Sequence, residues 1–156
     1  MEICIVSVGV VIVDTDIIYN EVYEDLRKKT SPDREKYLGI STGFGMLDKY
    51  TTGFNKSDLI LIGARPAMGK TSFALNIARN MAVTGRKKVV FFSLEMSKEQ
   101  LAQRILATEA RVESSKFRTG EISPEEWNRI GEAAYALNDA ELSFDDTSTI
   151  TVNEMK

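Results

Sequence analysis

The chain has 156 residues, of which 43% are hydrophobic and 28% are charged, and its formal net charge is −3. This length fits one domain with a workable core, and the composition excludes disordered and fibrous proteins. The charge carries no polyelectrolyte signature, so it gives no electrostatic argument for DNA binding.

The first element expected is a strand over residues 3–13, which are mainly valine and isoleucine. The run is far shorter than the roughly 20 residues that cross a bilayer, and Glu2 replaces the positive region of a signal peptide. We therefore expect no membrane segment. Cys4 is the only cysteine, which excludes an internal disulfide and agrees with a cytoplasmic protein.

A helix is expected next, from the capping residues 14–16 to Lys29. Acidic residues lead this segment and basic residues close it, as the helix dipole favours. Its apolar residues recur at every fourth position and are Ile18, Val22 and Leu26. Pro32 then breaks the helix within a polar linker, residues 30–36.

The main domain is expected to begin after this linker. Glycines punctuate residues 38–54, and four apolar side chains are expected to anchor that stretch: Phe44, Met46, Leu47 and Tyr50. We therefore predict two parts. Residues 1–36 form the strand and the linker helix, and residues 37–156 form the main domain.

A phosphate-binding loop is predicted where the next strand gives way to a helix. Residues 59–62 are branched aliphatics, which suit a strand buried on both faces of a parallel sheet. A turn follows, and a helix begins at once with Phe73, Ile77 and Met81 at four-residue spacing. Such a turn leaves backbone N–H groups free to cradle phosphate oxygens.

The side chains of this turn suit the phosphates of a nucleotide. Gly69 gives the backbone freedom to approach the ligand, Lys70 can place its ammonium between the β- and γ-phosphates, and the Thr71 hydroxyl can ligate a bridging Mg²⁺. The residues assigned to the nucleotide-binding site are those of the whole loop: Ala64, Arg65, Pro66, Ala67, Met68, Gly69, Lys70, Thr71 and Ser72.

Two details of the loop admit another interpretation. The general pattern is glycine, four residues and then Gly-Lys-Ser/Thr, but here Ala64 occupies the first glycine position, directly after Gly63. The alternative is a strand-turn-helix corner with a chance Gly-Lys-Thr, and the flanking elements argue against it. We interpret Pro66 itself as a rigid turn residue without ligand contact.

A carboxylate is predicted beside this loop. Residues 89–93 read as a second buried strand, Glu95 follows its end, and ligands of parallel sheets bind beyond the carboxyl ends of strands. The chain has no histidine, so a general base must be a carboxylate or a lysine. Glu95 can orient or deprotonate a water that attacks the γ-phosphate. The alternative is an ordinary loop glutamate before the helix that Ser97 caps.

The remaining elements complete an α/β pattern. Ser123 opens a capping box, and the helix that follows is expected to bury Trp127, Ile130, Ala134 and Leu137. Residues 142–144 read as a short strand. A last capping box at residues 151–154 leaves two residues after it, so we expect a truncated chain. The order of elements predicts an α/β fold with a mostly parallel sheet, incomplete at its C-terminus.

Three segments resemble the DnaB-type replicative DNA helicases, which are hexameric RecA-like motors. They are residues 39–48 with 52–54, the loop 64–71, and the Phe-Ser-Leu-Glu-Met-Ser stretch at 92–97. RecA and RadA recombinases are similar at the first segment, but their phosphate-binding loops usually carry extra glycines. The resemblance covers residues 37–156.

The resemblance implies a RecA-like P-loop NTPase core that binds ATP and Mg²⁺, with Glu95 as the catalytic carboxylate. It implies a homo-hexamer that moves on single-stranded DNA and unwinds duplex DNA during replication, with primase and a helicase loader as partners. The helix at residues 16–29 is similar to the family's linker helix, which docks on a neighbouring subunit. The family's second acidic motif, DNA-binding loops, γ-phosphate-sensing glutamine and arginine finger would lie beyond Lys156, so we expect this chain alone to hydrolyse ATP poorly.

Two other functions stay open. The first is a non-catalytic nucleotide-binding or interaction fragment of a split helicase, which would join helicase subunits through the linker helix. The second is a RecA/RadA-like recombination ATPase, or a clock-type ATPase of the same fold. Strand exchange or autophosphorylation, rather than DNA unwinding, would distinguish that second class.

Overall fold

The computed structural model describes residues 15–56, 58–151 and 153. The strand predicted over residues 3–13 lies outside the described residues, as does most of the capping box predicted at 151–154. The chain divides into two compact units, residues 1–38 and 39–156. None of the helices in the described part of the chain is long and apolar enough to cross a membrane.

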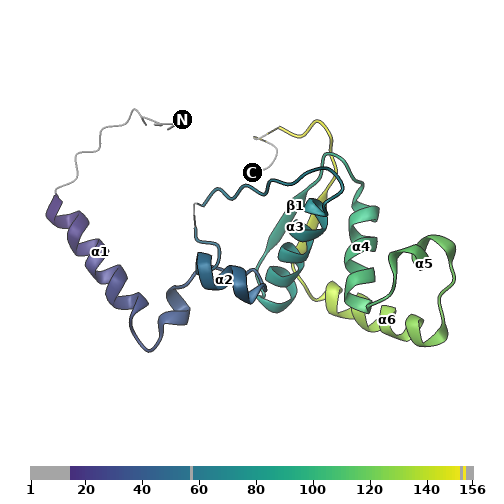
Figure 1. Ribbon diagram of the computed structural model, residues 1–156, viewed down its shortest axis with the longest axis horizontal. Helices are drawn as coiled ribbons and strands as arrows, with labels where there is room; N and C mark the ends of the chain where they lie inside the picture. The colour runs from purple at the N-terminus through teal and green to yellow at the C-terminus, as the bar shows by residue number, and fades with distance from the viewer. Residues whose placement is uncertain (1–14, 57, 152, 154–156) are drawn as a thin grey trace. The chain divides into compact units, whose positions relative to one another are not determined.

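The first unit contains the predicted linker helix. Helix α1 spans Thr15–Lys29, and a short 3-10 helix, η1, follows at Arg34–Tyr37 (Figure 1). The end of α1 is closed by Thr30, whose hydroxyl donates to the carbonyl of Leu26 at 2.9 Å. The apolar residues at four-residue spacing are all exposed within the described residues.

The second unit holds the remaining elements in α/β order. They are α2 (Gly45–Thr51), α3 (Lys70–Arg79), the π-helical turn η2 (Asn80–Thr84), β1 (Val89–Phe92), α4 (Lys98–Ala110), α5 (Ser114–Thr119), α6 (Pro124–Asn138) and β2 (Leu142–Asp145). β1 and β2 pair in parallel with Val89 opposite Leu142, so the predicted parallel pairing is confirmed. The helices α2 and α5 were not predicted.

The local signals for the starts of α4 and α6 are confirmed. Ser97 caps α4, where its side chain accepts from the Gln100 N–H and the Gln100 side chain accepts from the Ser97 N–H. Ser123 and Glu126 form the same reciprocal pair at α6. Both boxes satisfy two of the N–H groups that a helix end leaves unpaired, so each helix begins at a defined residue.

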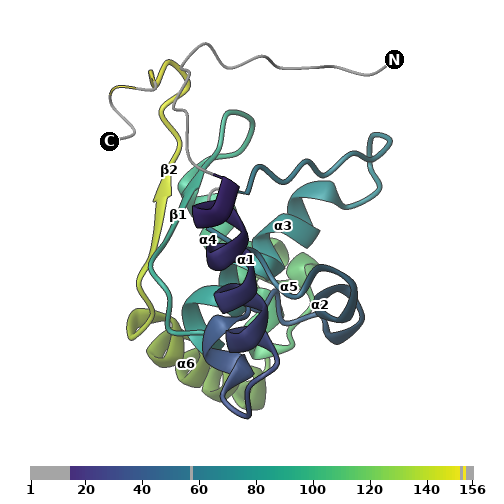
Figure 2. The same ribbon diagram turned by 90° about the vertical axis from the view of Figure 1, so that its left-hand side faces the viewer.

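The core of this unit lies between the two strands and helices α3 and α4. Leu101 of α4 is 0% exposed and shares one cluster with Leu75 of α3. The rings of Phe91 and Phe144, one from each strand, pack against that cluster with their centroids 6.2 Å apart. The strands run side by side with the helices against one face (Figure 2). A second cluster joins α4 to α6 through Ala110, Val112, Ile130 and Ala133.

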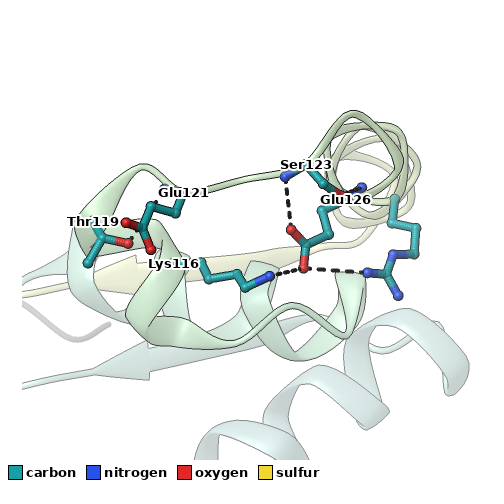
Figure 3. A network of polar contacts seen from close by, with 6 residues as sticks. Lys116, Thr119, Glu121, Ser123 and Glu126 are labelled. Carbon is teal, nitrogen blue, oxygen red and sulfur yellow. Dashed lines mark hydrogen bonds and ion pairs between the residues drawn. The ribbon is translucent and has the colours of Figure 1, made fainter.

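The corner between α5 and α6 is fixed by one carboxylate. Glu126 accepts from the Ser123 N–H at 2.9 Å and from Lys116 Nζ at 2.7 Å, and Arg129 lies 3.9 Å away (Figure 3). The hydrogen bond from Lys116, followed by that from the Ser123 backbone, lowers the pKa of Glu126 below its ordinary value. The corner is therefore held by a group that must stay ionised.

The strand predicted over residues 59–62 is wrong. The segment is not assigned to a strand, and among the described residues the only named strands that pair are β1 and β2. Leu59 and Leu61 are each 86% exposed, whereas Ile62 is partly buried. A strand exists only through hydrogen bonds to a neighbour. An apolar run therefore predicts where a strand can form, but not whether its partner is present.

Four residues that were expected to be buried or to anchor the fold are also exposed. Trp127 is 59% exposed, because the buried face of α6 centres on Ile130 and Ala133 and Trp127 falls at its edge. Met46 and Tyr50 project into solvent from α2. Phe44 is 36% exposed, although its ring lies 5.0 Å from that of Phe73 on α3.

Candidate nucleotide-binding site

The turn before α3 places its backbone in conformations that favour an open cradle. The Met68 N–H donates to the Arg65 carbonyl at 3.3 Å, Ala67 has φ +63° and Gly69 has φ +80°. Left-handed backbone costs an L-residue about 1–2 kcal/mol, whereas glycine adopts it freely. Strain of this kind, here at Ala67, is concentrated at functional sites.

Helix α3 begins at Lys70 without a side-chain cap. Gly69 occupies the N-cap position and has no side chain to offer, and the first helical bond runs from the Phe73 N–H to the Gly69 carbonyl at 2.9 Å. Among the described residues, no acceptor is found for the amides of Lys70, Thr71 and Ser72. Unpaired amides at a helix N-terminus, together with the helix dipole, form an anion-binding site.

One cavity brings the predicted site residues together. It has a volume of about 530 Å³ and is lined by residues 64–72, Glu95 and Arg104. This volume lies within the range of roughly 300–1,000 Å³ that is usual for ligand pockets. An adjoining cavity of about 340 Å³ is also lined by Lys70, Thr71 and Glu95, and it reaches the end of β1. The loop that is predicted to bind phosphate and the predicted carboxylate therefore face a common space.

Arg104 is the site residue that sequence reasoning missed. It lies on α4, lines the cavity of the loop, and has no ion pair or side-chain hydrogen bond within the described part of the chain. Arg79, the last residue of α3, lines a neighbouring cavity together with Arg104 and is by contrast paired with Glu109. The sequence offered one signal for it, an arginine beside the apolar positions Leu101 and Ile105. An unpaired guanidinium suits phosphate oxygens.

The donor set also fits a magnesium ion bound together with phosphates. Thr71 offers a hydroxyl and Glu95 a carboxylate to the same cavity. The described residues contain no group of three or more histidine, cysteine or acidic side chains able to hold a metal alone. Mg²⁺ is usually held by few protein ligands together with water and substrate phosphates. These residues therefore suit a metal that arrives with a nucleotide.

A chain of polar contacts fixes the far end of α3. Arg79 pairs with Glu109 of α4 and donates from Nη1 to Asn80 Oδ1 at 2.9 Å. Asn80 in turn donates from Nδ2 to the Thr42 carbonyl at 3.0 Å. Both Arg79 and Glu109 are largely buried, so this link joins α3 to α4 and to the entrance segment, residues 39–48, away from solvent.

The entrance segment is itself closed by Asp48. Its carboxylate accepts from the Thr42 N–H at 2.9 Å, from the Thr42 hydroxyl at 2.7 Å and from the Ser41 hydroxyl at 2.7 Å. Burial opposes ionisation of Asp48, but these hydrogen bonds outweigh it, so the pKa of Asp48 is lowered. Thr42 is fully buried. Asp48 therefore holds Thr42 in place, and the Thr42 carbonyl in turn binds Asn80 directly after the end of α3.

Known proteins are similar to this chain in sequence and in fold. The sequence model of the DnaB-like helicase C-terminal domain matches residues 39–156. Replicative DNA helicase DnaB of Geobacillus stearothermophilus is 42% identical over 136 residues, which are 87% of this chain and 30% of that protein. The DnaB of a Nostoc species is 49% identical over 118 residues, which are 76% of this chain and 13% of that protein. The chain thus spans less than a third of either relative.

Two solved structures have the same architecture. One, described as an ATPase domain, superimposes with a TM-score of 0.78 at 29% identity, covering 90% of this chain and 48% of that one. A DnaB-like replicative helicase, described with its interactions with primase, gives a TM-score of 0.79 at 28% identity, covering 91% and 33%. The predicted α/β fold and its resemblance are thereby confirmed. This protein belongs to the family of the DnaB-like helicase C-terminal domain.

Proposed function

We propose that this chain is the ATP-binding part of a replicative DNA helicase motor. One observation carries the proposal: the uncapped N-terminus of α3, Lys70, Thr71 and Glu95 line a single cavity. In the proposed complex the free amides of Lys70, Thr71 and Ser72 donate to the phosphates, and the Lys70 side chain bridges the β- and γ-phosphates. Thr71 would hold Mg²⁺, and Arg104 adds a positive charge from α4 to those of Arg65 and Lys70.

The proposed chemistry is attack of water on the γ-phosphate. Glu95 would orient this water and accept its proton, since the chain has no histidine to do so. Mg²⁺, when bound, would neutralise charge on the β- and γ-phosphates. Lys70 and Arg104 would stabilise the negative charge of the transferred group from two different elements, α3 and α4.

In the longer proteins, hydrolysis would drive movement along single-stranded DNA and unwinding of the duplex during replication. The relatives are named replicative DNA helicases, and one structural relative is described with primase. We extend to this chain the roles implied by that family: assembly as a homo-hexamer, contact with primase and a helicase loader, and action in the cytoplasm. Helix α1 would serve as the linker helix that contacts a neighbouring subunit.

A chimaera tests the motor function, because this chain spans only 30% of the Geobacillus stearothermophilus protein. Residues 39–156 replace the matching segment of that helicase, and unwinding of a forked duplex is measured with ATP. We expect ATP-dependent unwinding, and we expect the same chimaera with Lys70→Ala to be inactive. A folded chimaera that neither hydrolyses ATP nor unwinds DNA would contradict the proposal. Hydrolysis without unwinding would favour a different motor of the same fold.

A further inference from the structure

The loop that presents Glu95 is closed by one buried hydroxyl. Ser93 follows β1 directly and is 8% exposed. Its Oγ donates to the Met96 carbonyl at 2.7 Å and accepts from the Met96 N–H at 3.0 Å. One side chain therefore satisfies both backbone groups of the residue three positions later.

Both ends of this loop are fixed, and its apex is not. The Ser93 N–H donates to the Asp145 carbonyl of β2 at 2.8 Å, and the Lys98 N–H donates to Asp146 Oδ2 at 3.1 Å. Met96 packs against the core cluster that contains Leu101. Leu94 and Glu95 stand between these anchors and are exposed. The direction of Glu95 is therefore set by the turn that Ser93 closes.

Removal of this hydroxyl would leave two backbone groups of Met96 without a partner. Buried polar groups that lose their partner gain stability by moving to water, so the turn would open toward solvent. The backbone that carries Glu95 would then sample more positions than it does in the closed turn. A carboxylate that must meet an attacking water tolerates little displacement, since about 1 Å of misplacement costs up to roughly a hundredfold in rate.

We propose that Ser93 is a positioning residue, which holds Glu95 where it meets the water that attacks the γ-phosphate. In that step the water oxygen bonds to the γ-phosphorus, the bond from this phosphorus to the bridging oxygen breaks, and the water's proton passes to Glu95. Ser93 would act through the backbone that carries Glu95, because both hydrogen bonds of its hydroxyl are to Met96. The inference rests on the nucleotide site proposed above, and it predicts an effect on the reaction but not on nucleotide binding.

The test separates these two effects on the 156-residue chain. Calorimetry measures the Kd of Mg·ADP and of Mg·ADP with aluminium fluoride, which mimics the transferred phosphoryl group and its water. We expect Ser93→Ala to leave the Kd of Mg·ADP within twofold and to weaken the fluoride complex by roughly tenfold to a hundredfold. Single-turnover hydrolysis of ATP should fall by the same factor at unchanged ATP affinity.

Three controls make the result specific. Ser97→Ala removes the neighbouring hydroxyl, which caps α4, and should change neither Kd. Ser93→Thr keeps the hydroxyl and should restore the fluoride complex. In a Glu95→Ala background, Ser93→Ala should not change the Kd of the fluoride complex further, because the two residues act as one unit. The rate of hydrogen exchange at the Met96 amide should rise in Ser93→Ala and should stay unchanged in Ser97→Ala.

Each failure points to a different error. Equal loss of Mg·ADP and of the fluoride complex in Ser93→Ala, or a full effect in the Glu95→Ala background, would overturn the role of Ser93 while leaving the nucleotide site intact. A fluoride complex that Glu95→Ala does not weaken would overturn the role of Glu95. A folded wild-type chain that binds no Mg·ADP would overturn the proposed function, and this inference with it.

Discussion

Replacement of Leu101 by alanine should break the contact that holds α4 against α3. Leu101 is 0% exposed and shares its cluster with Leu75 of α3 and with Ile105. Leucine-to-alanine changes in enclosed cores cost roughly 2.7–5.0 kcal/mol, because the lost transfer free energy adds to the cost of a cavity. We expect Leu101→Ala to lower the free energy of unfolding by about 3 kcal/mol, which for a chain of this size lowers Tm by roughly 6–12 °C.

Urea denaturation followed by far-ultraviolet circular dichroism measures this loss. Leu59→Ala is the matched control, because it makes the same chemical change at an exposed leucine and should stay within about 0.5 kcal/mol. The double variant with Leu75→Ala should lose less than the sum of the two single losses, since both side chains line one cavity. A loss below about 1 kcal/mol for Leu101→Ala would refute the packing of α4 on α3.

Three further predictions follow from the polar contacts and the loop. Arg79→Ala should cost about 1–3 kcal/mol in urea denaturation, because it leaves Glu109 largely buried without its cation; a loss within measurement error would remove the link between α3 and α4 from the account. The lowered pKa of Glu126 means that its contribution to stability is complete above its ordinary pKa of about 4.3 and is lost as pH falls through the lowered value. Thermal denaturation between pH 6 and pH 3 should therefore show a smaller acid destabilisation in Glu126→Gln, and an unchanged pH profile in that variant would contradict the prediction. Gly69→Ala should weaken nucleotide binding by roughly fivefold to thirtyfold, since a left-handed alanine costs about 1–2 kcal/mol that binding must recover; unchanged affinity would show that the loop does not need this conformation.

The sequence predicted those features of the fold that depend only on residues close together in the chain. Ser97 and Ser123 begin capping boxes that involve neighbouring residues alone, so the starts of α4 and α6 were readable from the sequence. The turn that is predicted to bind phosphate also has a local cause. This turn and the helix at Lys70 depend on a short stretch that includes a glycine at a left-handed position.

Features that depend on distant partners were not predictable in the same way. Residues 59–62 have the composition of a buried strand, but a strand also requires a neighbour, and composition does not reveal one. Trp127 lies at the edge of its helix's buried face, and that face is set by α4 rather than by the helix itself. Arg104 faces the loop only because α4 packs on α3. These outcomes depend on how the elements pack against one another.

Calorimetric titration of the 156-residue chain with ATP in Mg²⁺ measures whether the loop before α3 binds a nucleotide. The comparison is between the wild type and Lys70→Ala, with Arg118→Ala as a control that removes a positive charge away from the loop's cavity. We predict that the wild type and Arg118→Ala bind ATP and that Lys70→Ala loses at least tenfold in affinity, or about 1.4 kcal/mol. A well-folded wild type that binds no ATP, or a Lys70→Ala variant that binds ATP equally well, would show that this loop is not the nucleotide site.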